Sequence, residues 1–374
     1  MVIVPRTCDD EDDNDHRILH IKAGQRYILK DGDELPYKLL KNLGHGGCAI
    51  VEEVQDQWTG KVFARKVFKI RGSQANRKHI FENEVKIIQR LATHHHIIRV
   101  FATYVSKREV GLILSPVASR GALDGFLQDA HEGLLTESDT AILTGSFGCL
   151  ANGLAFMHTQ NVRHKDIKPH NILVHGNSLI YTDFGSSLDY SASTRSVTTG
   201  FPNSVTRRYA APEVHDWSPR SSKTDVFSLG CVYLEILCAL KICDIPADMT
   251  PYREYTLELG ALLGSIENEG VWINAVTTTT QAMLNIDKEF RPSAKSLTTT
   301  LWKAQPSMFC EPCCLDLSAQ IPILPVSPVS SSNPLLVSSR RLTHYSVAYP
   351  ASTEVSAVFK HDQYGMTAAL KLIY

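Results

Sequence analysis

The chain has 374 residues, with 38 Lys and Arg against 39 Asp and Glu and a formal net charge of −1. This balance argues against the strongly basic surface of a dedicated nucleic-acid or membrane-surface binder, so we expect neither partner. Hydrophobic residues make up 43% and charged residues 21%, which is typical of a globular chain long enough to bury large cores without disulfides.

Targeting signals and cysteine usage bear on the compartment. The first residues, Met1 to Arg6, resemble neither a signal peptide nor a transit peptide, and the sequence turns acidic after Cys8. We find no run of 18 apolar residues, so we expect no segment that spans a bilayer. The nine cysteines are scattered and odd in number, which favours free thiols in a reducing compartment. We therefore expect an intracellular protein, cytoplasmic, nuclear or both.

The chain begins with an acidic extension and continues with a small sheet. Residues 9–15 are almost all acidic, so we interpret residues 1–36 as a largely flexible N-terminal extension. After Pro36 the periodicity changes, and it predicts strands within Leu39–Val54, at Val62–Ile70, near Val100 and at Val110–Leu114, with one helix at His79–Leu91.

The rest of the chain is predicted to be mostly helical up to about Lys303. Asp139–His158 is a strongly apolar helix, and Val226–Leu240 is apolar nearly all round, which predicts a position in the centre of a core. Residues 304–374 contain a stretch rich in Pro and Ser without sustained periodicity, so we expect a disordered tail.

A glycine-rich segment lies between two of the predicted strands. Gly44 and Gly46 would allow a close approach of the backbone to a phosphate. A glycine-rich hairpin turn explains the same residues equally well. The position between two strands argues against the Rossmann and Walker patterns, in which a helix follows the loop.

A lysine and a glutamate on neighbouring elements form the second candidate. Lys66 lies in the middle of a predicted strand among apolar residues, where an unpaired charge would be costly to bury. Glu84, on the predicted helix, can pair with it, and the pair could bind a nucleotide phosphate. The alternative is a surface lysine on an edge strand.

The third candidate is the segment from His164 to Asn171. Within it, the carboxylate of Asp166 can orient a hydroxyl and accept its proton, while the ammonium of Lys168 can neutralise a transferring phosphoryl group. The side-chain carbonyl of Asn171 can bind a metal ion. Asp183 follows twelve residues later and offers a second hard oxygen ligand for Mg²⁺.

In their order and spacing these segments resemble the eukaryotic protein kinase family. Ala211-Pro212-Glu213 resembles the end of that family's activation segment, Asp225 matches a helix landmark, and the family pairing predicts a contact between Glu213 and Arg291. The resemblance covers about Leu39 to Lys303. It implies an α+β, bilobal fold with an N-lobe at 37–114, a hinge at 115–118 and a C-lobe at 119–303.

The resemblance also implies the reaction and the role of each residue. The expected function is ATP-dependent transfer of the γ-phosphoryl group to Ser or Thr hydroxyls of proteins, with Mg²⁺. Asp166 is the expected base, Lys168 contacts the γ-phosphate, Asn171 and Asp183 hold Mg²⁺, and Lys66 contacts the α- and β-phosphates. The other residues assigned to ATP are Leu43, Gly44, His45, Gly46, Gly47, Cys48, Ala49, Ile50, Val51, Ala64, Glu84, Ser115, Val117 and Leu173. The alternative is a pseudokinase that acts as a non-catalytic scaffold. The oligomeric state and the substrate are not readable.

Further residues predict which type of kinase the chain resembles and how phosphorylation would regulate it. Lys168, in Asp-Ile-Lys-Pro, matches the serine/threonine type of kinase. In that type a threonine bridges the catalytic base and this lysine, and Thr206 matches that threonine. Lys165 replaces the usual arginine before the catalytic aspartate and cannot hold a phosphate bidentately. We therefore predict activation by phosphorylation that is present but weak, at Thr198, Thr199 or Ser204. The alternative is a constitutively active enzyme.

Two further clusters suggest metal binding but have simpler explanations. His94, His95 and His96 are adjacent and point in different directions, so one tetrahedral site cannot use all three, and a structural turn is favoured. Cys310, Cys313 and Cys314 resemble half of a zinc site. No second Cys or His pair follows at the spacing found in zinc fingers, so we expect free thiols there.

Overall fold

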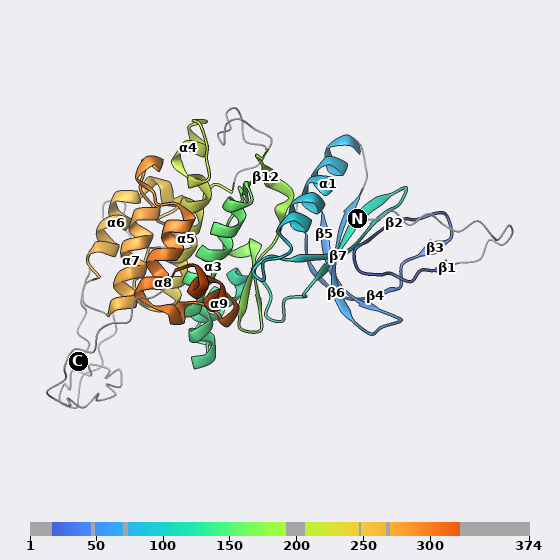
Figure 1. Cartoon of the computed structure of the whole chain (residues 1–374), viewed down its shortest axis with the longest axis horizontal. Helices are drawn as coiled ribbons and strands as arrows, with labels where there is room; N and C mark the ends of the chain where they lie inside the picture. The colour runs from blue at the N-terminus through green and yellow to red at the C-terminus, as the bar shows by residue number, and fades with distance from the viewer. Residues whose placement is uncertain are drawn as a thin grey trace, which may run out of the picture. The chain divides into compact units, whose positions relative to one another are not determined.

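A computed structural model describes residues 17–45, 49–69, 74–191, 206–246, 248–266 and 270–321 of the chain. All of them belong to one compact unit, Met1–Ile323. A six-stranded sheet with one helix forms its N-terminal part, and helices dominate the part that follows (Figure 1). The predicted α+β, bilobal fold is confirmed.

The N-lobe sheet is antiparallel except at one edge. Its strands run in the order β2-β7-β8-β6-β5-β4, and β2 alone pairs parallel, with β7. Helix α1 packs beside β7 and β8. The elements are β2 (Gln25–Ile28), β4 (Tyr37–His45), β5 (Ile50–Asp56), β6 (Val62–Lys69), α1 (Gln74–Leu91), β7 (Arg99–Val105) and β8 (Glu109–Ser115).

Part of the N-terminal extension belongs to this sheet, so the prediction of a flexible segment is wrong for residues 17–36. Besides β2, a short parallel pair joins β1 (Arg17–Ile18) to β3 (Asp33–Glu34). Arg26 on β2 forms an ion pair with Glu82 on α1 at 2.5 Å. The indole nitrogen of Trp58 donates to the carbonyl of Leu19 at 3.1 Å. Residues 1–16, with the acidic run, lie outside the described part.

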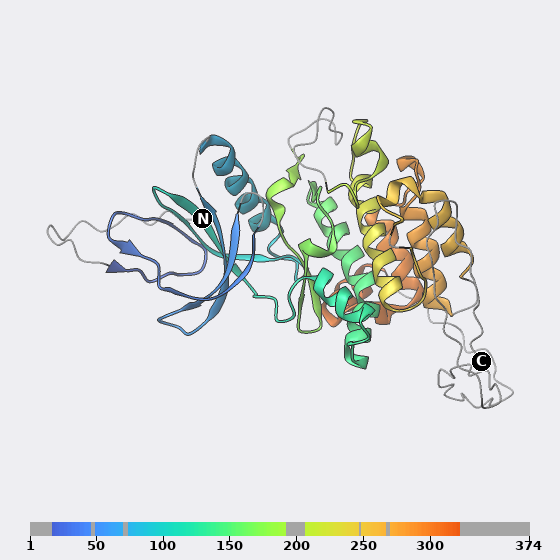
Figure 2. The same cartoon turned by 180° about the vertical axis from the view of Figure 1, so that it is seen from behind.

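The C-lobe is built mainly from helices, with two small two-stranded sheets beside them (Figure 2). Its helices are α2 (Leu123–His131), α3 (Glu137–Thr159), α4 (Pro212–His215), α5 (Lys223–Ala239), α6 (Thr256–Gly264), α7 (Val271–Met283), α8 (Ala294–Ala304) and α9 (Glu311–Gln320). The strands are β9 (Val162–Arg163), β10 (Ile172–His175), β11 (Ser178–Tyr181) and β12 (Leu188–Asp189), and β9 pairs with β12 and β10 with β11. Single 3₁₀ turns occur at Pro169–Asn171, Phe184–Ser186, Tyr252–Glu254, Lys288–Phe290 and Pro306–Met308.

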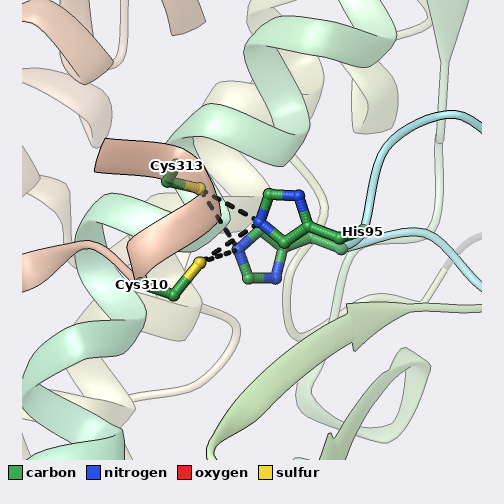
Figure 3. Close-up of side chains that lie close together, drawn as sticks. His95, Cys310 and Cys313 are labelled. Atoms are coloured by element: carbon green, nitrogen blue, oxygen red, sulfur yellow. Dashed lines mark hydrogen bonds between the residues drawn. The ribbon is translucent and has the colours of Figure 1, made fainter. Parts of the chain in front are cut away.

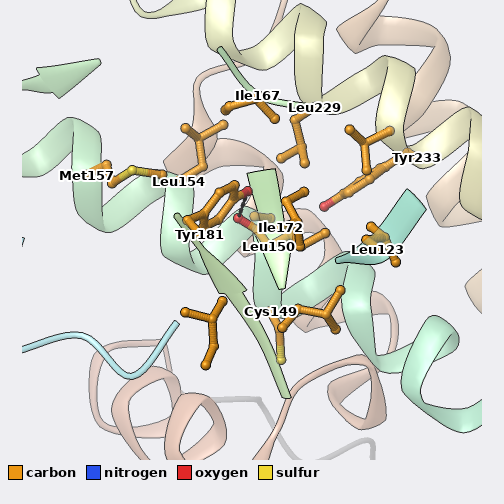
Figure 4. Close-up of a cluster of buried hydrophobic side chains, with 14 of the residues drawn as sticks. Leu123, Cys149, Leu150, Leu154, Met157, Ile167, Ile172, Tyr181, Leu229 and Tyr233 are labelled. Carbon is orange, nitrogen blue, oxygen red and sulfur yellow. Dashed lines mark hydrogen bonds between the residues drawn. The ribbon is translucent and has the colours of Figure 1, made fainter. Parts of the chain in front are cut away.

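Helix α3 lies at the centre of the C-lobe core. It begins at a capping box, in which Thr136 and Asp139 satisfy each other's backbone N–H groups. Side chains from α3, β10, β11 and α5 meet around it (Figure 4), and Tyr181 donates to the carbonyl of Leu150 at 2.9 Å. The helix is long and apolar enough to cross a membrane, but 67% of its most apolar window is buried in the protein. We therefore interpret α3 as a core helix.

The folded domain continues past residue 303. In α9, Cys313 is fully buried and Leu317 is 4% exposed, and Met308 before it is fully buried. A Cβ atom on Gly148 of α3 would lie 2.4 Å from the carbonyl oxygen of Met308, so a side chain at that position is excluded. The prediction of a disordered tail is wrong for residues 304–321. Residues 322–374 lie outside the described part.

These corrected boundaries predict a difference in stability between two truncated chains. A chain cut to residues 37–303 should unfold at a lower denaturant concentration than one cut to residues 17–321. Each large apolar side chain that loses its burial costs about 1.5–3 kcal/mol, and Met308 and Leu317 are both removed with α9. Equilibrium denaturation followed by circular dichroism measures the difference. Equal midpoints would show that β2 and α9 add nothing to the core.

Candidate active site

Lys66 is held by two carboxylates from different elements. It lies on β6, between β5 and β8, so the alternative of an edge strand is wrong. Its Nζ atom donates to both carboxylate oxygens of Glu84, at 2.7 and 2.9 Å, and to Oδ1 of Asp183 at 2.7 Å. Lys66 and Glu84 are both buried. The predicted pair between strand and helix is present and is extended to Asp183.

Lys66 and Asp183 stabilise each other's charges, whereas at Glu84 burial outweighs the effect of Lys66 and raises the pKa of the carboxyl. Burial alone would lower the pKa of Lys66, but the carboxylates of Glu84 and Asp183 raise it above its usual value. Burial would raise the pKa of Asp183, but Lys66 lowers it to about 2. Since the pKa of Asp183 is depressed by folding, this ionised group stabilises the fold at neutral pH, and its contribution is lost as the pH falls towards 2.

Contacts with the segment after Asp183 fix the position of α1. Lys86 and Arg90 of α1 both form ion pairs with Asp189, each at 2.9 Å. The side-chain amide of Asn83 donates to the carbonyl of Ser187 at 2.9 Å. These contacts hold the helix that carries Glu84 close to Lys66. Our sequence analysis missed them, because an exposed stripe of polar residues on a helix has many possible partners.

The segment from His164 to Asn171 forms a closed hydrogen-bond network around Asp166. Lys168 donates to Oδ2 of Asp166 at 2.8 Å, and the hydroxyl of Thr206 donates to Oδ1 at 2.7 Å. Lys168 also donates to the Thr206 hydroxyl at 3.0 Å, so this threonine bridges the aspartate and the lysine as predicted. The amide nitrogen of Asn171 donates to the backbone and the carboxylate of Asp166 at 2.8 and 2.9 Å.

Asp225, on α5, holds the backbone of this loop in place. Its carboxylate accepts from the backbone N–H groups of His164 and Lys165, both at 2.9 Å. His164 is fully buried, and its ring lies 4.8 Å from the ring of Phe184. Helix α5 therefore holds the backbone of this loop, and His164 of the loop packs against Phe184 in the segment after Asp183.

Two residues have the chemistry expected of magnesium ligands. Asp183 offers a carboxylate, and Asn171 retains its amide oxygen because its amide nitrogen is the donor to Asp166. Hard oxygen ligands of this kind suit Mg²⁺. Asp183 has a left-handed backbone with φ of +59°, a conformation that costs energy in a residue with a side chain and that is found preferentially at functional sites. The residues present therefore fit the ion.

The apolar residues predicted to contact adenine come from both lobes. Ala49 and Ala64 are buried, and Val51, Val117 and Leu173 are partly buried against the same core. Leu43 is 39% exposed. Gly44 pairs with Val51 and His45 with Ile50 across the hairpin of β4 and β5, and Ser115 ends β8. Gly46, Gly47 and Cys48 lie outside the described residues.

A buried ion pair closes the end of the activation segment. Arg291 donates to Glu213 through two parallel hydrogen bonds of 2.7 and 2.9 Å, and its guanidinium lies 4.9 Å from the centre of the Phe227 ring. The side chains are 0% and 7% exposed. The pairing predicted for Glu213 and Arg291 is confirmed.

Removing one partner of this pair should destabilise the protein strongly. We expect Arg291→Ala to lower the free energy of unfolding by about 3–5 kcal/mol, because it leaves the Glu213 carboxylate buried without its counter-charge. The matched control is Lys107→Ala, which breaks the exposed pair between Lys107 and Asp31 and should cost at most about 1 kcal/mol. Urea denaturation of both variants measures the difference. If both variants lost the same free energy of unfolding, the buried Glu213–Arg291 pair would stabilise the protein no more than the exposed pair does.

Comparison with known proteins agrees with this geometry. The family model for the protein kinase domain matches residues 37–307, which is more than half of the chain. The chain therefore belongs to the eukaryotic protein kinase family, and its named relatives are of the serine/threonine type.

The relatives are about 30% identical to this chain over the segments that align with it. An Aurora kinase of Yarrowia lipolytica is 33% identical over 220 residues, which cover 58% of this chain and 55% of that protein. Mouse serine/threonine-protein kinase DCLK2 is 29% identical over 205 residues, or 54% of this chain and 26% of that protein. Human death-associated protein kinase 2 is 29% identical over 206 residues, or 52% of each chain. The match thus spans between a quarter and about half of these curated relatives.

Proposed function

We propose that this chain is a catalytically active protein kinase that transfers the γ-phosphoryl group of ATP to Ser or Thr hydroxyls of protein substrates. The observation that carries the proposal is the engagement of Lys66 with both Glu84 and Asp183. Each contact requires a different element to be in place, α1 for the first and the segment after β11 for the second. Both requirements are met in one arrangement.

The network around Asp166 supports a role as the base. The two donors, Lys168 and Thr206, hold its carboxylate in one orientation. The carboxylate would orient the attacking hydroxyl and accept its proton as the new O–P bond forms. Lys168 is positioned beside it to neutralise the negative charge on the transferring phosphoryl group.

The remaining residues would bind and position ATP. Lys66 would contact the α- and β-phosphates, and the buried Ala64 and the partly buried Val51 and Leu173 would contact the adenine ring. Asn171 and Asp183 would hold Mg²⁺, which neutralises phosphate charge when bound. Positioning of this kind accounts for most of the catalysis in phosphoryl transfer.

The alternative is a pseudokinase that binds partners without turnover. Proteins of that kind usually lack one of the three charged groups, whereas Lys66, Asp166 and Asp183 are all present here. Lys66 donates to Asp183, and Thr206 donates to Asp166. An assay with Mg·ATP and a panel of Ser/Thr-rich protein substrates distinguishes the two functions. Phosphate incorporation that requires Mg²⁺ supports the kinase. Nucleotide binding without any incorporation, into substrates or into the chain itself, supports the pseudokinase.

We also propose an intracellular location. The support is that the cysteines of the described part of the chain are all free of disulfides.

The basic residues beside the catalytic loop support control by phosphorylation. Burial lowers the pKa of Lys165, and the positive charges of Arg163 and Arg220 lower it further, while Asp225 opposes them. A phosphate group on the activation segment would relieve the repulsion among these three cations. The predicted acceptors Thr198, Thr199 and Ser204 lie outside the described residues, as do the other hydroxyl residues of 192–205.

Phosphatase treatment should therefore lower the activity of the native enzyme. Because a lysine binds a phosphate less specifically than an arginine, we expect phosphatase treatment to remove a larger share of the activity in Lys165→Arg than in the native chain. Initial rates before and after treatment, with the phosphatase removed before the assay, measure both effects. Unchanged rates in both proteins would show that the segment orders itself and that the enzyme is constitutively active.

A further inference from the structure

Two histidines and two cysteines from distant parts of the chain converge at one point. His95 and His96 lie in the loop between α1 and β7, and Cys310 and Cys313 lie at the start of α9. Their ligand atoms, one from each side chain, all lie within 4.8 Å of one another. Figure 3 shows Cys310 and Cys313 facing His95 from the first turn of the helix. None of the four residues belongs to the catalytic network.

The distances match those of a tetrahedral zinc site. The Nε2 atom of His95 lies 3.2 Å from Sγ of Cys310 and 3.3 Å from Sγ of Cys313. The Nε2 atom of His96 lies 3.4 Å from each of the same sulfurs. Zinc bonds of ~2.3 Å to sulfur and ~2.0–2.1 Å to nitrogen, at tetrahedral angles, place N and S about 3.6 Å apart. The four nitrogen–sulfur distances therefore need to change by only a few tenths of an ångström to accommodate the ion, and the widest pair of ligand atoms, within 4.8 Å, by at most about 1 Å.

The surrounding hydrogen bonds prepare these atoms to bind a metal. His96 donates its Nδ1–H to the carbonyl of Leu179 at 2.6 Å, which leaves the Nε2 lone pair directed at the sulfurs. Metal-bound histidines commonly make such a bond through the second ring nitrogen. The amide of Asn152 on α3 donates to Sγ of Cys313 at 3.1 Å, a contact that stabilises a thiolate. Cys310 is the N-cap residue of α9, where the helix dipole also favours negative charge.

We propose that His95, His96, Cys310 and Cys313 form a structural zinc site. Binding of Zn²⁺ displaces one proton from each cysteine thiol and none from the two neutral imidazoles, so the complete site has a formal charge of zero. A neutral site is suited to its surroundings, since His96 and Cys313 are both fully buried. Four protein ligands leave no open position, as is typical of structural rather than catalytic zinc.

The proposed ion would attach α9 to the body of the domain. Helix α9 follows the end of the family match at residue 307, so it is an addition to the shared kinase domain. The ion would link it to the loop that follows α1, the helix that carries Glu84. Our sequence analysis rejected zinc because it sought a second pair of ligands after the cysteines. The pair precedes them instead, and His95 is separated from Cys310 by 215 positions.

Elemental analysis of the full-length chain tests the proposal. The chain is purified under reducing conditions without chelators, and we expect about one zinc per chain by mass spectrometry. Replacement by Co²⁺ should give the visible absorption of a tetrahedral site and a thiolate-to-cobalt charge-transfer band. Absence of stoichiometric zinc, even after zinc is added back, would overturn the proposal. So would a peptide cross-linked between Cys310 and Cys313 in a digest of the chain, which indicates a disulfide instead.

Single substitutions locate the ion. Cys310→Ser and Cys313→Ser should each lose the zinc, whereas Cys314→Ser, the matched control, should retain it because the Cys314 thiol contacts backbone carbonyls instead. Asn152→Ala should weaken zinc binding by about 10–100-fold. Zinc retained by both ligand variants would place the ion elsewhere and contradict the assignment.

A stability measurement separates this site from the proposed catalytic function. Chelation of zinc should lower the melting temperature of the full-length Asp166→Asn variant by about 5 °C or more and should expose α9 to protease. Because this variant lacks the proposed base, the result does not depend on whether the chain is an active kinase. An unchanged melting temperature and an unchanged cleavage pattern would show that zinc does not hold α9.

Discussion

Lys66→Met is expected to lower phosphoryl transfer by ~10²-fold or more, because it removes the ammonium group that would position the phosphates of ATP. The same change leaves Glu84 buried without its counter-charge, which alone costs about 3–5 kcal/mol of stability. Activity must therefore be measured together with the melting temperature. Initial rates with Mg·ATP at a temperature well below unfolding provide the comparison.

A double variant separates catalysis from stability. Lys66→Met combined with Glu84→Gln removes both charges and should recover much of the lost stability but none of the activity. Lys61→Met, at an exposed position in the turn before β6, is the control and should behave like the native chain. Substantial activity in the double variant would show that Lys66 serves the fold and not the reaction.

Asp166→Asn is expected to lower the rate by about 10²–10⁴-fold, the usual contribution of a positioned general base. Asparagine has nearly the same shape. Its amide oxygen can still accept from Lys168 and Asn171 while its NH2 group donates to the Thr206 hydroxyl, but the amide cannot accept the proton of the substrate hydroxyl. We therefore expect the melting temperature and the affinity for ATP to stay close to native values. Steady-state kinetics with nucleotide titration measure both.

The control for this substitution is Asp31→Asn, which alters an exposed aspartate paired with Lys107. It should leave the rate unchanged. A rate in Asp166→Asn equal to that of the control would exclude Asp166 as the base. A large loss of ATP affinity would instead assign it a role in binding.

The fold and the catalytic network could be predicted because their signals are local or ordered along the chain. Strands β5 and β6 are rich in Val and Phe or Ile, α3 is strongly apolar, and Asp166, Lys168 and Asn171 lie within six residues of each other. The resemblance to the family then supplied the long-range contacts. The pairs Lys66–Glu84 and Glu213–Arg291 join distant segments, and residue chemistry alone gave only the first of them, as one of two alternatives.

The missed features depend on pairings that leave a weak local signal. Strand β2 has four residues, and its pairing with the parallel strand β7 begins only at Ala102, so no hairpin turn marks the connection. Gly24 and Gly32, with φ of +76° and +88°, frame that strand and were the available clue. Helix α9 is short, and only two of its side chains are well buried, which gives little periodicity. Its contribution to the domain depends on His95 and His96, whose partners the sequence order does not reveal.

Incorporation of phosphate from Mg·ATP, followed by phosphoamino-acid analysis, tests the central claim most directly. Native full-length chain and Asp166→Asn are compared at equal concentration against the same Ser/Thr-rich substrates. We predict that the native chain forms phosphoserine or phosphothreonine and that the variant forms at least ~10²-fold less. Equal incorporation by the two proteins, or none by the native chain with its activation segment phosphorylated, would contradict the assignment of this site as an active kinase centre.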